Sequence, residues 1–142
     1  MQSRLVLLAV TTSVAVAGCG SADTQAPVVA ATAHRFMVAL SAGSVDEACS
    51  LLDQHGQSLL KHSLAPLMQF AHTGGNTASC PAEARFLRDA VMTPHQLQQL
   101  TNTKPTEVSV SGSTAKARIG GNFWLSKSQA GWRIDELPIS GG

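Results

Sequence analysis

The chain has 142 residues, and its 10 Lys and Arg against 9 Asp and Glu give a formal net charge of +1. A charge this close to zero, with no basic stripe, argues against a nucleic-acid partner. The four Phe, two Trp and no Tyr are too few rings for a usual carbohydrate-binding platform.

The N-terminal residues predict a signal peptide. Arg4 precedes residues 5–17, which carry no charge. About 13 such residues suit the apolar core of a signal peptide and fall short of the ~20 that a membrane-spanning helix needs. We therefore expect residues 1–18 to be removed and the mature chain to lie outside the cytoplasm.

The end of this stretch, Val16-Ala17-Gly18-Cys19, resembles the bacterial lipobox, an aliphatic residue and two small residues before a cysteine. The resemblance implies that the Cys19 thiol receives a diacylglyceryl group and that cleavage occurs before it. The alternative is an ordinary secretory signal in which the cysteine is incidental. Several acyl chains on one cysteine retain a protein far more firmly than a single chain does. The expected location is the extracytoplasmic face of a cell membrane, with Cys19 as the anchor.

The mature chain is long enough for one domain with a real core. Residues 19–27 contain small and polar side chains and end at Pro27, so they predict a short linker after the anchor. Residues 28–142 predict a single α+β domain.

Two cysteines remain if Cys19 is modified. An even pair outside the cytoplasm predicts a disulfide between Cys49 and Cys80. Two unpaired buried thiols are the alternative. A metal site is disfavoured, because neither cysteine belongs to a CxxC motif and no histidine is close to either in sequence.

The first half of the domain predicts helices. Residues 28–42 place apolar side chains at helical spacing: Val29, Ala33, Phe36, Met37 and Leu40. A second helix begins at Ser44 with a capping box to Glu47 and extends to Gly56. Pro66 predicts a division between two short helices at 57–65 and 66–71. Further helices are expected after Ser79, with Ala82, Phe86 and Ala90 facing inward, and after Thr93, with a second capping box to Gln96.

From residue 106 the apolar period changes to two, which predicts strands. Four short runs, at 106–110, 114–119, 122–127 and 132–137, are separated by Gly- and Ser-rich turns. Such spacing is typical of an antiparallel meander. Helices followed by strands predict an α+β fold, with N-terminal helices packed on a C-terminal sheet.

The segments "RFMVALSAGSVDEACSLL" and "GWRIDEL", with a Cys-Pro helix between them, resemble small actinobacterial lipoproteins whose domain is similar to the nuclear-transport-factor-2-like (cystatin-like) cone. The resemblance covers about residues 28–138. It implies a cone-like α+β domain and a disulfide joining a helix cysteine to another some thirty residues later, which suits Cys49 and Cys80. Cone-fold enzymes of the ketosteroid-isomerase type use Tyr and Asp, and this chain has no Tyr.

No motif with catalytic or metal-ligand spacing is present in the sequence. The five histidines are scattered, and none belongs to HExxH or a comparable pattern. Asp46 and Glu47 suit a helix start, and Asp135 and Glu136 suit a solvated strand edge. The sequence therefore predicts no catalytic residue, no metal and no cofactor.

Three aromatic residues are candidates for the wall of an apolar pocket: Phe36, Trp124 and Trp132. Simple core packing is the alternative interpretation for them. The leading functional hypothesis is a non-catalytic binding module for a small apolar ligand or an envelope protein. A cone-fold enzyme acting on a small apolar molecule and a structural envelope protein are the two alternatives.

Overall fold

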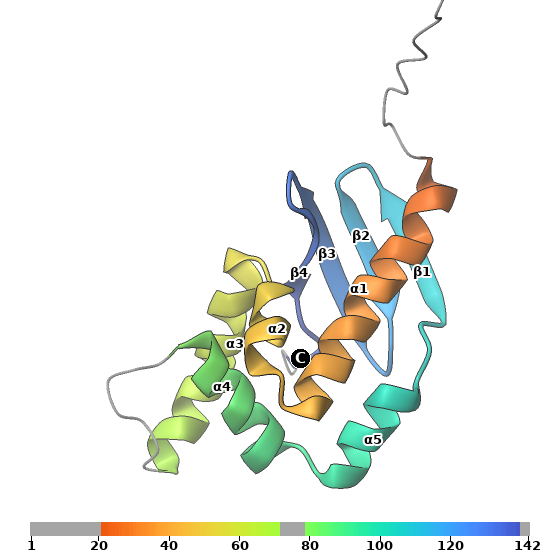
Figure 1. Cartoon of the computed structure of the whole chain (residues 1–142). Coiled ribbons are helices and arrows are strands. Elements are labelled where there is room, and N and C mark those ends of the chain that lie inside the picture. The colour runs from red at the N-terminus through yellow and green to blue at the C-terminus, as the bar shows by residue number, and fades with distance from the viewer. Residues whose placement is uncertain (1–20, 72–78, 140–142) are drawn as a thin grey trace, which may run out of the picture.

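The computed structural model describes residues 21–71 and 79–139. Within these ranges, helices precede a four-stranded antiparallel sheet, so the predicted α+β order is confirmed (Figure 1). The signal segment 1–18 and Cys19 lie outside the described residues. In the described part of the chain, no helix is both long enough and apolar enough to cross a membrane.

The elements follow one another with short connections. The helical part consists of α1 (Ala22–Ala42), α2 (Val45–Ser50), α3 (Gln54–Phe70), α4 (Cys80–Phe86), the π-helical turn η1 (Leu87–Val91) and α5 (Pro94–Asn102). The strands are β1 (Glu107–Ser111), β2 (Thr114–Arg118), β3 (Asn122–Ser128) and β4 (Gly131–Glu136).

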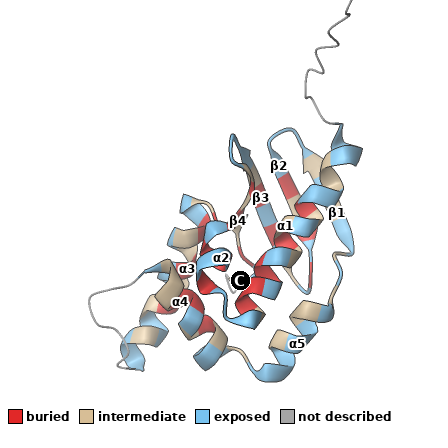
Figure 2. Ribbon diagram, in the orientation of Figure 1, coloured by how far each residue is buried: buried red, intermediate tan, exposed pale blue. Residues whose placement is uncertain are grey.

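The sheet is a meander in the order β1-β2-β3-β4, with antiparallel neighbours throughout. Alternate side chains of a strand point to opposite faces. The inner face is buried against α1, and Figure 2 shows the buried residues concentrated between this helix and the strands. The apolar side chains of that face are Ala115, Ala117, Phe123, Leu125, Trp132 and Ile134.

Helix α1 carries the apolar stripe that the sequence predicts, and all five of its predicted members are buried. Its start corrects the linker expected at residues 19–27, because the helix already begins at Ala22 and contains Pro27. The Gln25 side chain accepts hydrogen bonds from Trp132 Nε1 at 2.8 Å and Lys127 Nζ at 3.2 Å. These contacts tie the first turns to β4 and β3, so tertiary contacts extend the helix through a proline.

The second predicted helix is shorter than expected, because α2 ends at Ser50 rather than near Gly56. The chain then leaves the helix, and Leu52 forms a parallel bridge with Ile134 of β4. Gly56 lies in the first turn of α3, where an added Cβ would collide with the Ile134 carbonyl oxygen. The glycine therefore permits the close approach of α3 to β4 instead of ending a helix.

Pro66 does not divide α3, which continues to Phe70. A proline lacks the N–H that would bond the carbonyl four residues earlier, which disfavours a helix interior. Leu60 and Leu64 are buried, and Met68 packs against the same core. Because this i, i+4, i+8 stripe crosses Pro66, packing offsets the missing hydrogen bond.

One of the two predicted capping boxes is confirmed. Thr93 and Gln96 exchange both hydrogen bonds at the start of α5. Ser44 makes no side-chain cap at α2, and Glu47 instead pairs with Arg35 of α1 at 2.9 Å. The arginine from the neighbouring helix competes for the carboxylate that the box requires.

The inward face of residues 80–91 also differs from the prediction. Glu83, Ala84 and Leu87 are buried, whereas Ala90 is exposed. The π-helical turn at Leu87–Val91 alters the regular helical spacing on which the prediction depended.

Candidate functional site

An apolar cavity of about 200 Å³ lies where α1, η1 and α5 meet one end of the sheet. Its wall combines side chains from segments that are far apart in sequence: Phe36, Met37, Leu40, Leu87, Met92, Leu100, Ile119, Gly120, Phe123, Leu137, Pro138 and Ile139. The cavity is similar in size to one of 150 Å³ that stays dry and binds benzene when its lining is apolar.

The floor of the cavity is rigid core. Phe36 of α1 and Phe123 of β3 pack edge to face, with ring centroids 6.3 Å apart and planes at 64°. Leu40 is one helical turn from Phe36 on the same face of α1, and all three side chains are buried. The helical period of α1 and the two-residue period of β3 thus direct three large side chains to one place.

The far wall is formed by residues 137–139, which follow β4. Gly121 faces Pro138 so closely that a Cβ at position 121 would overlap the proline ring. This contact holds the segment against the β2–β3 turn, beside Ile119 and Gly120. The absence of a side chain at Gly121 therefore determines where the cavity ends.

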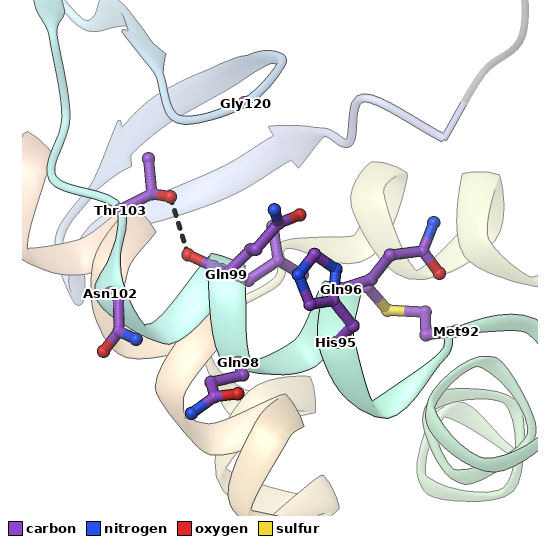
Figure 3. Close-up of a pocket in the computed structure, with 9 residues that line it drawn as sticks. Met92, His95, Gln96, Gln98, Gln99, Asn102, Thr103 and Gly120 are labelled. Atoms are coloured by element: carbon purple, nitrogen blue, oxygen red, sulfur yellow. Dashed lines mark hydrogen bonds between the residues drawn. The ribbon is translucent and has the colours of Figure 1, made fainter.

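A polar groove of about 710 Å³ adjoins the cavity and shares Met92, Leu100 and Gly120 with it. Figure 3 shows the lining side chains distributed along and beside α5, with the β2–β3 turn at Gly120 above the helix and the Thr103 hydroxyl donating to the Gln99 carbonyl. The remaining lining is amide, imidazole and hydroxyl: His95, Gln96, Gln98, Gln99, Asn102 and Thr103. An apolar cavity bordered by neutral hydrogen-bonding groups suits an apolar ligand with a polar end.

Helix α5, which separates groove from cavity, contains no buried residue. Polar contacts hold it to α1: His34 Nε2 donates to the Thr101 carbonyl at 3.1 Å, and the hydroxyls of Thr101 and Ser41 are hydrogen-bonded at 3.1 Å. A helix held in this way opens more easily than one that is buried in the core. Access to the cavity is therefore expected past α5.

The structure distinguishes the three predicted wall residues. Phe36 lines the cavity. Trp132 is buried, but it packs elsewhere and donates its indole N–H to Gln25. Trp124 lies on the outer face of β3, 43% exposed, with Lys116 Nζ 5.4 Å from its ring centroid. Neither tryptophan lines the cavity: Trp124 points outward because Phe123 and Leu125 occupy the inward-facing positions of β3, and Trp132 points inward but packs beside Gln25 instead.

The chemistry of the cavity lining is that of a binding surface. None of the described residues that line it has a titratable side chain, and the groove contains one, His95. Aliphatic and aromatic walls bind by removing apolar surface from water, at about 25 cal/mol per Å². The sequence patterns had not indicated Met92, Leu100 or residues 137–139 as part of a pocket wall. Two features of the sequence could have indicated them: the apolar residues of the short amphipathic helix after Thr93, and the Leu-Pro-Ile segment that follows the last strand.

A second polar cluster joins the start of α3 to β3 and β4. Asp53 caps α3 by accepting from the Gly56 N–H at 2.8 Å, and the Ser126 hydroxyl donates to its other oxygen at 2.7 Å. His55 Nδ1 lies 3.2 Å from Asp135 Oδ1. Asp135 therefore belongs to a network of side chains, which the expectation of a solvated strand edge did not include.

Burial opposes ionisation of Asp53, but the hydrogen bonds from Gly56 and Ser126 outweigh it and lower the pKa of that carboxyl. Burial, together with the hydrogen bond and charge of Asp53, raises the pKa of Asp135. Ligand atoms of His55, Asp135 and Glu136 lie within 4.8 Å of one another. Exposed groups at this spacing are common without an ion, so we assign no metal site.

Cys49 and Cys80 are joined, as the sequence predicts. Cys49 of α2 and Cys80 of α4 lie 5.9 Å apart at Cα with their sulfurs at 2.00 Å, a disulfide that spans 31 residues of sequence. The bond clamps α4 to α2 on the side of the molecule away from α5. It thereby joins two helices that both contribute buried residues to the core, Ala48 from α2 and Ala84 from α4.

Comparison with known proteins adds no assignment: no protein-family model, curated protein or solved structure matches the chain. The site must therefore be interpreted from its own geometry.

Proposed function

We propose that this protein is a lipid-anchored, extracytoplasmic binding module that holds a small apolar ligand, or the apolar part of a larger one, in the cavity beneath α5. The observation that carries the proposal is an apolar cavity of about 200 Å³ beside a neutral polar groove. The apolar walls supply affinity, and the groove accommodates a polar end group.

The location is proposed from the N-terminal sequence and the disulfide. The Val16–Cys19 lipobox pattern follows an uncharged stretch of signal-peptide length. A disulfide persists in oxidising compartments and is rare in the cytosol. Metabolic labelling with a fatty-acid analogue tests the anchor: Cys19→Ser should abolish both labelling and membrane retention. Undiminished labelling of this variant would refute lipidation.

Binding is tested with toluene, a ring of the size the cavity accommodates, on the full chain in detergent by ligand-detected NMR. Leu100→Trp should fill the mouth and abolish toluene binding, since Leu100 borders both cavity and groove. Leu67→Trp, an exposed position on α3, is the matched control and should bind toluene normally. Absence of saturable binding by the unmodified protein, or equal binding by both variants, would contradict the proposal.

A further inference from the structure

A separate hollow of about 200 Å³ lies between α3 and α4, away from α5. One helical face of α3 lines it with Gln54, Gln57, Ser58 and Lys61, which follow the i, i+3, i+4, i+7 spacing of neighbouring side chains. The start of α4 adds Cys80 and Glu83. The Gln57 amide nitrogen donates to the Cys49 carbonyl at 3.2 Å, which orients that side chain in the wall.

Glu83 is the feature of this hollow that requires an explanation. Its residue is 2% exposed, and it is the one charged residue that is buried in the described part of the chain. Among the described residues, its Oε1 has no hydrogen-bond partner. Burial raises the pKa of the Glu83 carboxyl, and the nearby Lys61 charge opposes that rise. Buried carboxylates are normally paired, so the site lacks a hydrogen-bond donor.

Lys61 lines the same hollow without supplying that donor. No ion pair joins it to Glu83 within 4.0 Å in the described structure. Two side chains of opposite charge thus line one space without forming an ion pair. A simple cation in that space would be repelled by Lys61, and a simple anion would be repelled by Glu83. A molecule carrying both charges at separate ends complements both side chains.

We propose that this hollow binds a small zwitterion of the amino-acid class, with its ammonium group on Glu83 and its carboxylate on Lys61. Charge-assisted hydrogen bonds of this kind are stronger than neutral ones. Gln54 and Ser58 at the rim offer neutral partners to a small side chain. The volume equals that of about seven waters in the liquid, enough for a small amino acid.

Isothermal titration calorimetry of the full chain in detergent, with glycine as the probe, tests this directly. Glycine has five non-hydrogen atoms, so its Kd should be no tighter than about micromolar. Acetate and methylamine each carry one of the two charges and should bind at least about 10-fold more weakly. Failure of glycine to saturate, or equal binding of either single-charge probe, would overturn the proposal.

Variants locate the site. Glu83→Gln keeps the size of the side chain and removes the charge, and Lys61→Gln changes an exposed position with little effect on folding. Each should weaken glycine binding at least about 10-fold. Lys104→Gln, a second exposed lysine, is the matched control and should leave the Kd unchanged.

Unchanged glycine affinity in Lys61→Gln would overturn the assignment even if Glu83→Gln failed to fold. Toluene binding should persist in these variants, so this proposal and that for the apolar cavity fail separately.

Discussion

The apolar cavity beneath α5 and the hollow between α3 and α4 have the same volume, about 200 Å³, but opposite chemistry. The first lies where the inward faces of α1 and the sheet converge, so only apolar side chains reach it. The second lies between α3 and α4 and is lined mainly by polar side chains, among which the Glu83 carboxylate is buried. The difference teaches that the position of a cavity relative to the core determines what it can bind.

The first hollow is continuous with the core, so breaking it should have the largest effect on stability. Phe36→Ala removes a ring that packs on Phe123 and should lower the free energy of unfolding by about 3–5 kcal/mol. Chemical denaturation measures the change. Phe70→Ala is the matched control, because Phe70 is 89% exposed, and it should cost less than about 0.5 kcal/mol. Equal losses would show that the core does not support the cavity.

The second hollow depends instead on a covalent clamp. Replacing Cys49 and Cys80 together by Ala should lower the free energy of unfolding by about 2–5 kcal/mol, since the unfolded chain gains conformational freedom. The same double variant should weaken glycine binding, because Cys80 lines that hollow, while toluene binding persists. If neither a reductant nor the double substitution changed the melting temperature, a stabilising role of the disulfide would be contradicted.

The stability of Glu83→Gln relative to the wild type should depend on pH, which tests the buried carboxylate of the second hollow. A carboxyl with a raised pKa in the folded state stabilises the protein fully below its unfolded pKa, and that contribution is lost as pH rises through the folded pKa. Because Gln does not titrate, the variant should match the wild type near pH 4 and be more stable by about 1 kcal/mol at pH 7. Denaturation at both pH values checks this. A variant that is less stable at pH 7 would mean that the charge is well paired.

The smallest effect is expected outside both hollows. Trp124→Ala should cost less than about 1 kcal/mol, since the ring is largely solvated and its contact with Lys116 is a surface cation–π interaction. Trp132→Ala provides the contrast, with a loss of about 3–5 kcal/mol, because Trp132 is 4% exposed and anchors Gln25. Toluene binding that disappeared in Trp124→Ala would place this residue at the site after all.

Local patterns predicted a large part of this fold. The apolar stripe of α1, the four strands and the Thr93 cap all follow from neighbouring residues. The stripe depends on the 3.6-residue period, the strands depend on the two-residue period, and the cap depends on a pair three positions apart. Each of these signals is contained within one segment, so no partner from elsewhere in the chain is needed to produce it.

Tertiary contacts decided the remainder. Helix α1 extends through Pro27 because Gln25 meets Trp132, and α3 continues through Pro66 because its apolar stripe packs on the core. The Ser44–Glu47 capping box does not form, and Glu47 pairs with Arg35 of α1 instead. In each case a contact between distant segments outweighs a local preference of about 1–3 kcal/mol.

The candidate sites show the same division. The sequence alone predicted Phe36 as a candidate wall residue, and it predicted the Cys49–Cys80 pair. It could not place residues 137–139 against Gly121, nor bury Glu83 beside Lys61, because those arrangements exist only when helices and sheet have docked. A cavity is the space between elements, so its lining depends on how distant segments pack, and the periodicity of a single helix or strand does not predict that packing.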